Sequence, residues 1–166
     1  MSRWRHLCAI VALPGAVTVL GPILVLARSG PRFAWGLQLP AVLLVVLFGL
    51  ALIAGGLWLF TRTLLLFARA GKGTLAPWDP TSRLVISGPY RLVRNPMITA
   101  VAAVLLGEAT LLGRPSLIIY VLAFISLNHT YFVLVEEPGL THRFGEDYRR
   151  YKRAVPRWLP RTTRHS

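Results

Sequence analysis

Residues 39–60 read LPAVLLVVLFGLALIAGGLWLF, a continuous apolar run without a charged side chain. About 20 apolar residues in helical conformation cross the hydrocarbon core of a bilayer. Inside lipid every backbone polar group needs a partner within the protein, and a helix supplies one within the segment itself. We therefore predict a transmembrane helix here, with a continuation towards Ala68 that places Arg62 near the membrane surface, where its side chain can snorkel.

Three further segments of similar character lie on either side of this run. They cover about Leu7–Ala27, which contains two prolines that should kink it, then Met97–Leu112 and Ser116–Val135. The last two are separated by the turn Gly113–Pro115, so they should form a tight antiparallel hairpin. The predicted fold is all-α, a polytopic membrane protein with about four transmembrane helices.

Small residues recur at four-residue spacing in two of these predicted helices. Ala51 and Gly55 form one such pair, and Ala103 and Gly107 form the other. Spacing of this kind allows the backbones of two membrane helices to approach closely. We therefore expect close helix packing along these residues.

The composition agrees with a membrane protein and argues against a nucleic-acid partner. The 166 residues are 54% hydrophobic and 15% charged, whereas about a quarter of the residues of a soluble domain are charged. The net charge of +13 comes from basic residues just outside the apolar runs, where they would meet anionic headgroups. We expect one transmembrane domain over residues 1–166, with the first two helices in 1–70 and the remaining features in 71–166. The single cysteine, Cys8, excludes an intramolecular disulfide, and no metal site is expected.

The distribution of Lys and Arg predicts the orientation in the membrane. Fifteen of them fall in the termini and in the loop from Arg69 to Asn95, and three, Arg28, Arg32 and Arg114, fall in the other loops. Cytoplasmic loops carry the excess of basic residues. Both termini are therefore predicted to be cytoplasmic, in an integral protein of the cell inner membrane.

The hairpin brings most of the polar residues to one level of the membrane. Its register places Asn95–Pro96 beside Glu136–Glu137, with Arg91 and Arg94 close enough to pair with these glutamates or with a shared ligand. Two adjacent carboxylates at a membrane boundary lose hydration and need cationic partners. An ion pair that only holds the hairpin together is the simpler interpretation, and both remain open here. Glu108 lies near the opposite surface, and His129 is more often a hydrogen-bonding than a ligand-binding residue in such a position.

The C-terminal segment has the pattern of an amphipathic surface helix. Pro138 should end the fourth span, Gly145 should bend the segment, and Pro156 should stop it. Apolar and aromatic residues recur at helical spacing, and basic residues lie between them in the sequence. The recurring residues are Leu140, Phe144, Tyr148, Tyr151 and Val155.

Two blocks of sequence resemble a known family. The loop GPYRLVRNPM (88–97) is the first, and the second consists of Glu136–Glu137, FGEDY (144–148), Tyr151–Lys152 and VPR (155–157). Together they resemble the isoprenylcysteine carboxyl methyltransferases, whose bacterial relatives and phospholipid methyltransferases carry similar loops. The matching region covers about Trp78 to Arg161.

The resemblance implies a membrane-embedded enzyme that uses S-adenosylmethionine near the cytoplasmic surface. The positions it assigns to the cofactor site are Tyr90, Val93, Arg94, Asn95, Pro96, Glu136, Glu137, Tyr148 and Tyr151. Among them Arg94 and Glu137 are the expected catalytic residues. The chain departs from the family pattern at Asn95, where many members have histidine, and at Ile98, where tyrosine is frequent. Because an amide does not titrate in the physiological range, acid–base catalysis from position 95 is in doubt.

The methyl acceptor is expected to be a lipophilic small molecule or a membrane lipid, for example a carboxylate of the prenylcysteine type. Two other classes are compatible with the same helices. One is a membrane reductase of the steroid-reductase type, which would bind a nicotinamide cofactor. The other is a non-catalytic membrane protein, in which every polar feature is structural.

Overall fold

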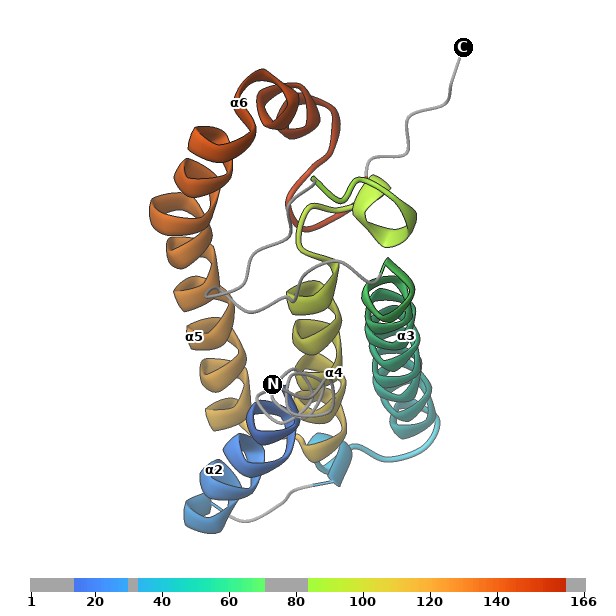
Figure 1. Cartoon of the computed structure of the whole chain (residues 1–166). Helices are drawn as coiled ribbons and strands as arrows, with labels where there is room; N and C mark the ends of the chain where they lie inside the picture. The colour runs from blue at the N-terminus through green and yellow to red at the C-terminus, as the bar shows by residue number, and fades with distance from the viewer. Residues whose placement is uncertain (1–13, 30–32, 71–83, 161–166) are drawn as a thin grey trace. The chain divides into compact units, whose positions relative to one another are not determined.

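A computed structural model describes residues 14–29, 33–70 and 84–160, and within them the elements are helices joined by turns and short irregular segments. They fall into two compact units, Met1–Trp58 with Ala100–Ser126, and Leu59–Thr99 with Leu127–Ser166. The all-α prediction is confirmed for this part of the chain (Figure 1). Cys8 and residues 71–83 of the predicted cofactor loop lie outside the described residues. The division of the domain near residue 70 stays a prediction.

The first unit begins with the described part of the first predicted span. Its elements are a π-helical turn, η1 (Ala16–Leu20), and the helix α2 (Gly21–Ser29), followed by a 3₁₀ turn, η2 (Phe33–Gly36). The Tyr120 hydroxyl donates a hydrogen bond to the carbonyl of Val17, 2.9 Å away. Its ring lies so close to Gly21 that a side chain there would collide with it. Residues 7–13 of the predicted span are outside the described part.

Helix α3 (Ala41–Ala70) is the element predicted from the opening stretch of the sequence. Its segment Ala41–Leu66 is long and apolar enough to cross a membrane, and only 11% of its most apolar window is buried. A core helix of a soluble protein would be mostly buried. The exposed face includes Leu44 and Leu47, which fits contact with lipid.

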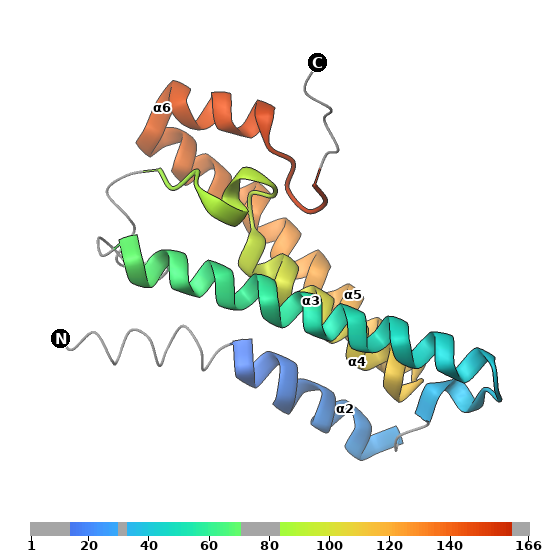
Figure 2. The same ribbon diagram turned by 90° about the vertical axis from the view of Figure 1, so that its right-hand side faces the viewer.

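Glycines set the packing of α3 against α4 (Pro96–Leu112) within the first unit (Figure 2). A Cβ on Gly49 would come within 2.8 Å of the Leu111 side chain, and one on Gly107 within 2.6 Å of the Gly49 carbonyl oxygen. Gly56 approaches Ala100 equally closely. Close helix packing was predicted correctly at Gly107. The prediction was wrong for the pair Ala51 and Gly55, because Gly55 faces open space. The contact face of α3 instead follows the seven-residue spacing of Gly49 and Gly56, which returns to the same side after about two turns.

Replacement of Gly56 by alanine is expected to lower the free energy of unfolding by about 1–3 kcal/mol, because overpacking forces the two backbones apart. A Cβ there would lie 2.7 Å from the carbonyl oxygen of Ala100. Gly55→Ala is the matched control on the neighbouring face, and it should be neutral or should stabilise by up to about 1 kcal/mol through helix propensity. Thermal unfolding in detergent measures both, and equal behaviour of the two variants would show that this packing face is wrong.

The predicted hairpin is present. Helix α4 ends at Leu112, α5 (Pro115–Tyr131) begins three residues later, and Gly113 turns the chain with φ +57°. Side chains buried in this part of the first unit include Leu105, Leu117 and Val121.

The fourth predicted span continues into the C-terminal helix without a break. Helix α5 passes through a second π-helical turn, η4 (Phe132–Glu136), into α6 (Glu137–Ala154) (Figure 1). The helix therefore does not end at Pro138, although the apolar part of the predicted span does end just before it, at Val135. Pro138 has no N–H to donate, and it lies just after the π-helical turn, where the backbone hydrogen bonding of the helix changes. The bend at Gly145 and the end before Pro156 are as predicted, with φ +55° and ψ −126° at Gly145.

Two helical segments of the described chain are long and apolar enough to span a membrane, Ala41–Leu66 and Pro115–Ala154. The apolar part of the second ends at Val135, and charged residues follow from Glu136 onward. Helix α4 is apolar but has 17 residues, and the first predicted span is only partly described. The structure thus supports a helical membrane protein with at least these two spans rather than the full count of four.

Candidate functional site

The second unit brings the loop before α4 against the end of the C-terminal segment. A 3₁₀ turn, η3 (Gly88–Arg91), opens this loop. The backbone N–H of Arg94 donates to the carbonyl of Pro156 at 2.9 Å, and the Tyr151 hydroxyl donates to the carbonyl of Tyr90 at 2.7 Å. The two blocks of sequence that carry the resemblance are therefore joined by direct hydrogen bonds.

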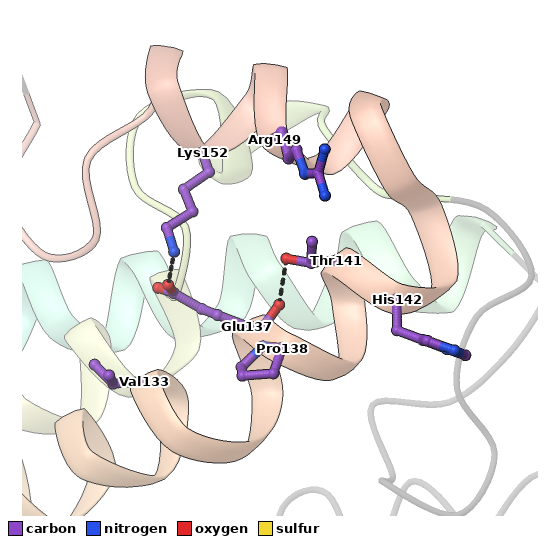
Figure 3. Close-up of a pocket in the computed structure, with 7 residues that line it drawn as sticks. All are labelled: Val133, Glu137, Pro138, Thr141, His142, Arg149 and Lys152. Carbon is purple, nitrogen blue, oxygen red and sulfur yellow. Dashed lines mark hydrogen bonds and ion pairs between the residues drawn. The ribbon is translucent and has the colours of Figure 1, made fainter.

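One buried carboxylate, Glu137, holds the site together. Arg94 Nη1 and Arg157 Nη2 each lie 2.6 Å from its Oε1, and Arg157 Nε also donates to that atom at 2.8 Å. Lys152 Nζ lies 2.6 Å from Oε2 (Figure 3). The Glu137 side chain is 6% exposed, and those of Arg94 and Arg157 are 11% and 18% exposed. The expected ion pair between Arg94 and one of the two glutamates is thus present.

The charges of this cluster do not balance. Glu137 contributes one negative charge, whereas Arg94, Lys152 and Arg157 contribute three positive charges. Burial alone would raise the pKa of Glu137, but the hydrogen bonds from Lys152 and Arg157 and the charge of Arg94 outweigh it and hold the pKa below its ordinary value. The carboxylate therefore stays ionised, and the surplus positive charge can attract an anionic group.

Arg94 has a further unused donor. Its Nε is buried and has no hydrogen-bond partner among the described residues. Buried polar groups of a folded protein normally have a partner, so an orphan donor beside a charged cluster points to a missing acceptor. Arg91, three residues earlier in the loop, is exposed and makes no ion pair with the two glutamates.

Glu136, adjacent in sequence, lies in a different environment. Burial raises its pKa to about 7, and the negative charge of Glu137 adds to the effect. In the described part of the chain none of the three cations that surround Glu137 reaches it. One carboxylate is thus ionised and saturated with cations, while its neighbour favours a proton or a cationic ligand.

The raised pKa of Glu136 predicts a pH-dependent stability. Because the folded protein holds this proton more tightly than the unfolded chain, stability from this group is full below the ordinary pKa of 4.5 and is lost as the pH rises towards about 7. Glu136→Gln cannot ionise and should remove this loss. Melting temperatures in detergent between pH 5 and pH 8 measure it, and the same slope in both proteins would contradict the assignment.

Two tyrosines of the C-terminal segment are buried, and one of them, Tyr151, hydrogen-bonds to the loop. Tyr148 is 2% exposed, Tyr151 is 9% exposed, and their ring centroids are 6.1 Å apart. Burial raises the pKa of both tyrosines, so each stays a neutral hydrogen-bonding group. Val93 of the loop and Pro96, the first residue of α4, are also buried. Asn95 directly precedes α4, and its carbonyl accepts the first hydrogen bond of that helix from Thr99 at 3.0 Å.

Arg157 and Lys152 belong to the cluster but were absent from the expected site residues. Both fall in the second sequence block, yet spacing along the helix offers no reason to place Arg157, which follows the helix end, next to Glu137. The Arg157 guanidinium also approaches Nδ1 of His129 at 3.3 Å, and the indole N–H of Trp158 donates to the same nitrogen at 3.2 Å. His129 thus holds the C-terminal segment in place, in agreement with its predicted structural role.

Comparison with protein families places the chain in a known family. A model of the family described as phospholipid methyltransferase matches residues 44–147, more than half of the chain. The chain belongs to the phospholipid methyltransferase family. No curated protein matches the sequence.

Phospholipid methyltransferases are a family of membrane methyltransferases, so the coarser part of the resemblance is confirmed. The matched region contains Tyr90, the 93–96 segment and both glutamates of the site. It ends at Asp147, directly before Tyr148. The limb of α6 that carries Tyr151 and Lys152, together with Arg157, therefore lies beyond the matched part of the chain.

Proposed function

We propose that the protein is an integral-membrane, S-adenosylmethionine-dependent methyltransferase that acts on a lipophilic acceptor. The observation that carries the proposal is the buried cluster in which Arg94 of the loop meets Glu137 at the end of the apolar helix. Burial of these two charged groups costs free energy, because it removes them from water. Stability alone is therefore a poor reason for an ion pair at this position. Membership of a methyltransferase family supports this reading over a reductase or a non-catalytic protein.

The residues present fit the cofactor group by group. S-adenosylmethionine carries a carboxylate, an ammonium group, a sulfonium, ribose hydroxyls and a flat adenine. The surplus positive charge and the orphan Nε of Arg94 suit the carboxylate. Glu136 is not paired with any of the three cations that surround Glu137, so it suits the ammonium group of the cofactor. The rings of Tyr148 and Tyr151 suit the flat adenine base. Tyr90, Val93, Asn95 and Pro96 would complete the cofactor pocket from the loop.

When bound, the cofactor supplies an electrophilic methyl group on sulfur. Arg94 would orient an acceptor carboxylate or the cofactor's own carboxylate, while Glu137 keeps Arg94 in place. A carboxylate acceptor, such as that of a prenylcysteine-like molecule in the isoprenylcysteine carboxyl methyltransferase manner, is ionised at neutral pH and needs no general base. This agrees with Asn95 at the position where many relatives have a titrating histidine. The protein then acts by alignment and by exclusion of water.

We further propose that the site faces the cytoplasm, with both termini on that side of the cell inner membrane. The excess of Lys and Arg in the termini and in the loop before Asn95 supports this orientation.

Calorimetry of S-adenosylhomocysteine with detergent-purified protein tests the cofactor, and transfer of a labelled methyl group to fractionated membrane lipids tests the acceptor. Saturable binding and a labelled lipid product are the expected results. A folded protein that binds no S-adenosylhomocysteine at millimolar concentration would overturn the proposal.

A further inference from the structure

A second feature of the C-terminal helix goes beyond the cofactor cluster. A pocket of about 420 Å³ lies between the two limbs of the bent helix, and its lining residues are Val133, Glu137, Pro138, Thr141, His142, Arg149 and Lys152. The bend at Gly145 creates it, because φ +55° and ψ −126° turn the later limb back over the earlier one. Figure 3 shows Arg149 and Lys152 reaching down from the later limb towards Thr141 and Glu137.

The polar side of this pocket is cationic. Lys152 is 46% exposed and pairs with Glu137 Oε2, yet the single negative charge of that glutamate is already exceeded by the two positive charges of Arg94 and Arg157. Arg149 has only a 3.6 Å contact with Glu146, and both of these side chains are more than half exposed. Exposed ion pairs of this kind contribute little and exchange readily. Arg149 therefore remains able to bind an anion, and Lys152 adds a positive charge that Glu137 does not offset.

The other side of the pocket is apolar and lies where the membrane span ends. Val133 and Pro138 line it, and Leu134, 67% exposed, and Val135 lie in the same turn. Cationic pockets at this level of a membrane protein are suited to anionic headgroups, whose acyl chains then follow the apolar helix surface. A soluble phosphate compound would make no use of this apolar side.

We infer that this pocket binds the headgroup phosphate of an anionic phospholipid, with Arg149 and Lys152 on the phosphate and an acyl chain along Val133 and Leu134. The pocket shares Glu137 and Lys152 with the cluster around Arg94, whereas Val133 and Arg149 lie outside that cluster. It would hold a lipid molecule at the edge of the C-terminal limb.

Native mass spectrometry of the detergent-purified full chain tests this inference with phosphatidylglycerol and phosphatidylcholine as probes. The wild-type protein should retain phosphatidylglycerol with a preference of roughly tenfold, and Arg149→Gln should reduce that preference about fivefold, since each basic residue near the headgroups contributes on this scale. Arg150→Gln is the matched control, because Arg150 is adjacent and exposed but does not line the pocket. It should retain the wild-type preference.

Three results would overturn the inference. They are an unchanged preference in Arg149→Gln, an equal loss in Arg150→Gln, which would indicate a general field of positive charge, and displacement of the lipid by millimolar glycerol 3-phosphate, which would indicate a site for soluble phosphates. Binding of S-adenosylhomocysteine is measured on the same samples. Its absence from all samples would count against the proposed function alone and leave the lipid comparison readable.

Discussion

Glu137→Gln is expected to abolish methyl transfer and to lower the melting temperature of the detergent-purified protein by on the order of 10 °C. The glutamine leaves Arg94, Lys152 and Arg157 around a neutral side chain that is 6% exposed in the wild type. Removal of one partner from a buried ion pair costs about 3–5 kcal/mol, because the remaining charges lose their compensation without regaining water. Thermal unfolding and a labelled-methyl assay measure the two effects.

Glu146→Gln is the matched control for this prediction. Glu146 also pairs with two basic residues, Arg149 and Arg153, but its side chain is 55% exposed. Solvent screens such pairs, so the control should keep its melting temperature and its activity. A Glu137→Gln protein that melts and methylates like Glu146→Gln would show that the buried cluster is not the centre of the site. Circular dichroism at the assay temperature separates lost chemistry from lost helix.

Arg94→Gln is expected to reduce S-adenosylhomocysteine affinity and methyl transfer by tenfold to about a hundredfold. The substitution removes the 2.6 Å contact with Glu137 and the buried Nε that has no partner in the described chain. Hydrogen bonds to charged groups contribute about 1.5–3 kcal/mol, which sets this range. Arg94→Lys should restore little, because an ammonium group cannot bind two acceptors in the plane of a guanidinium. Calorimetry and initial rates measure the loss.

Arg91→Gln is the control from the same loop. Arg91 is exposed, and its replacement should change affinity and rate by less than about twofold. The double variant Arg94→Gln, Glu137→Gln adds a second test. If the two side chains act as a pair, the double variant should lose less than the sum of the single losses. Additive losses, or an Arg91 variant as impaired as the Arg94 variant, would show that Arg94 is not specifically placed.

Much of the architecture could be predicted from hydrophobicity alone. The run 39–60 became the N-terminal part of α3, which begins at Ala41, and the segments around Gly113 became the hairpin of α4 and α5. A bilayer requires about 20 apolar residues and internally satisfied backbone groups, so a long apolar run has few other structures available. The scarcity of acidic residues likewise made it possible to predict that Arg94 would meet one of the two glutamates.

Other predictions were wrong where the result depends on which face of a helix packs against its neighbour. The close-packed face of α3 carries Gly49 and Gly56. Gly56 follows directly after Gly55, the residue that was predicted to pack. The spacing of small residues was visible in the sequence, but several faces of an apolar helix carry them. Which face meets a neighbour depends on the fit of both helices. Pro138 does not end the helix, because the backbone hydrogen bonding has already changed in the π-helical turn before it.

The sequence by itself determined that this is a helical membrane chain in which basic residues meet one pair of carboxylates. Only the tertiary structure decided that Glu137, rather than Glu136, takes all three cations. In η4 the N–H of Glu137 bonds to the carbonyl of Phe132, five residues earlier, and this wider turn changes which side chain faces the loop. Arg157 reaches the same carboxylate after the helix has ended and the chain has turned back. Neither effect follows from periodicity, because both depend on contacts between segments 20 and 43 residues apart in the chain.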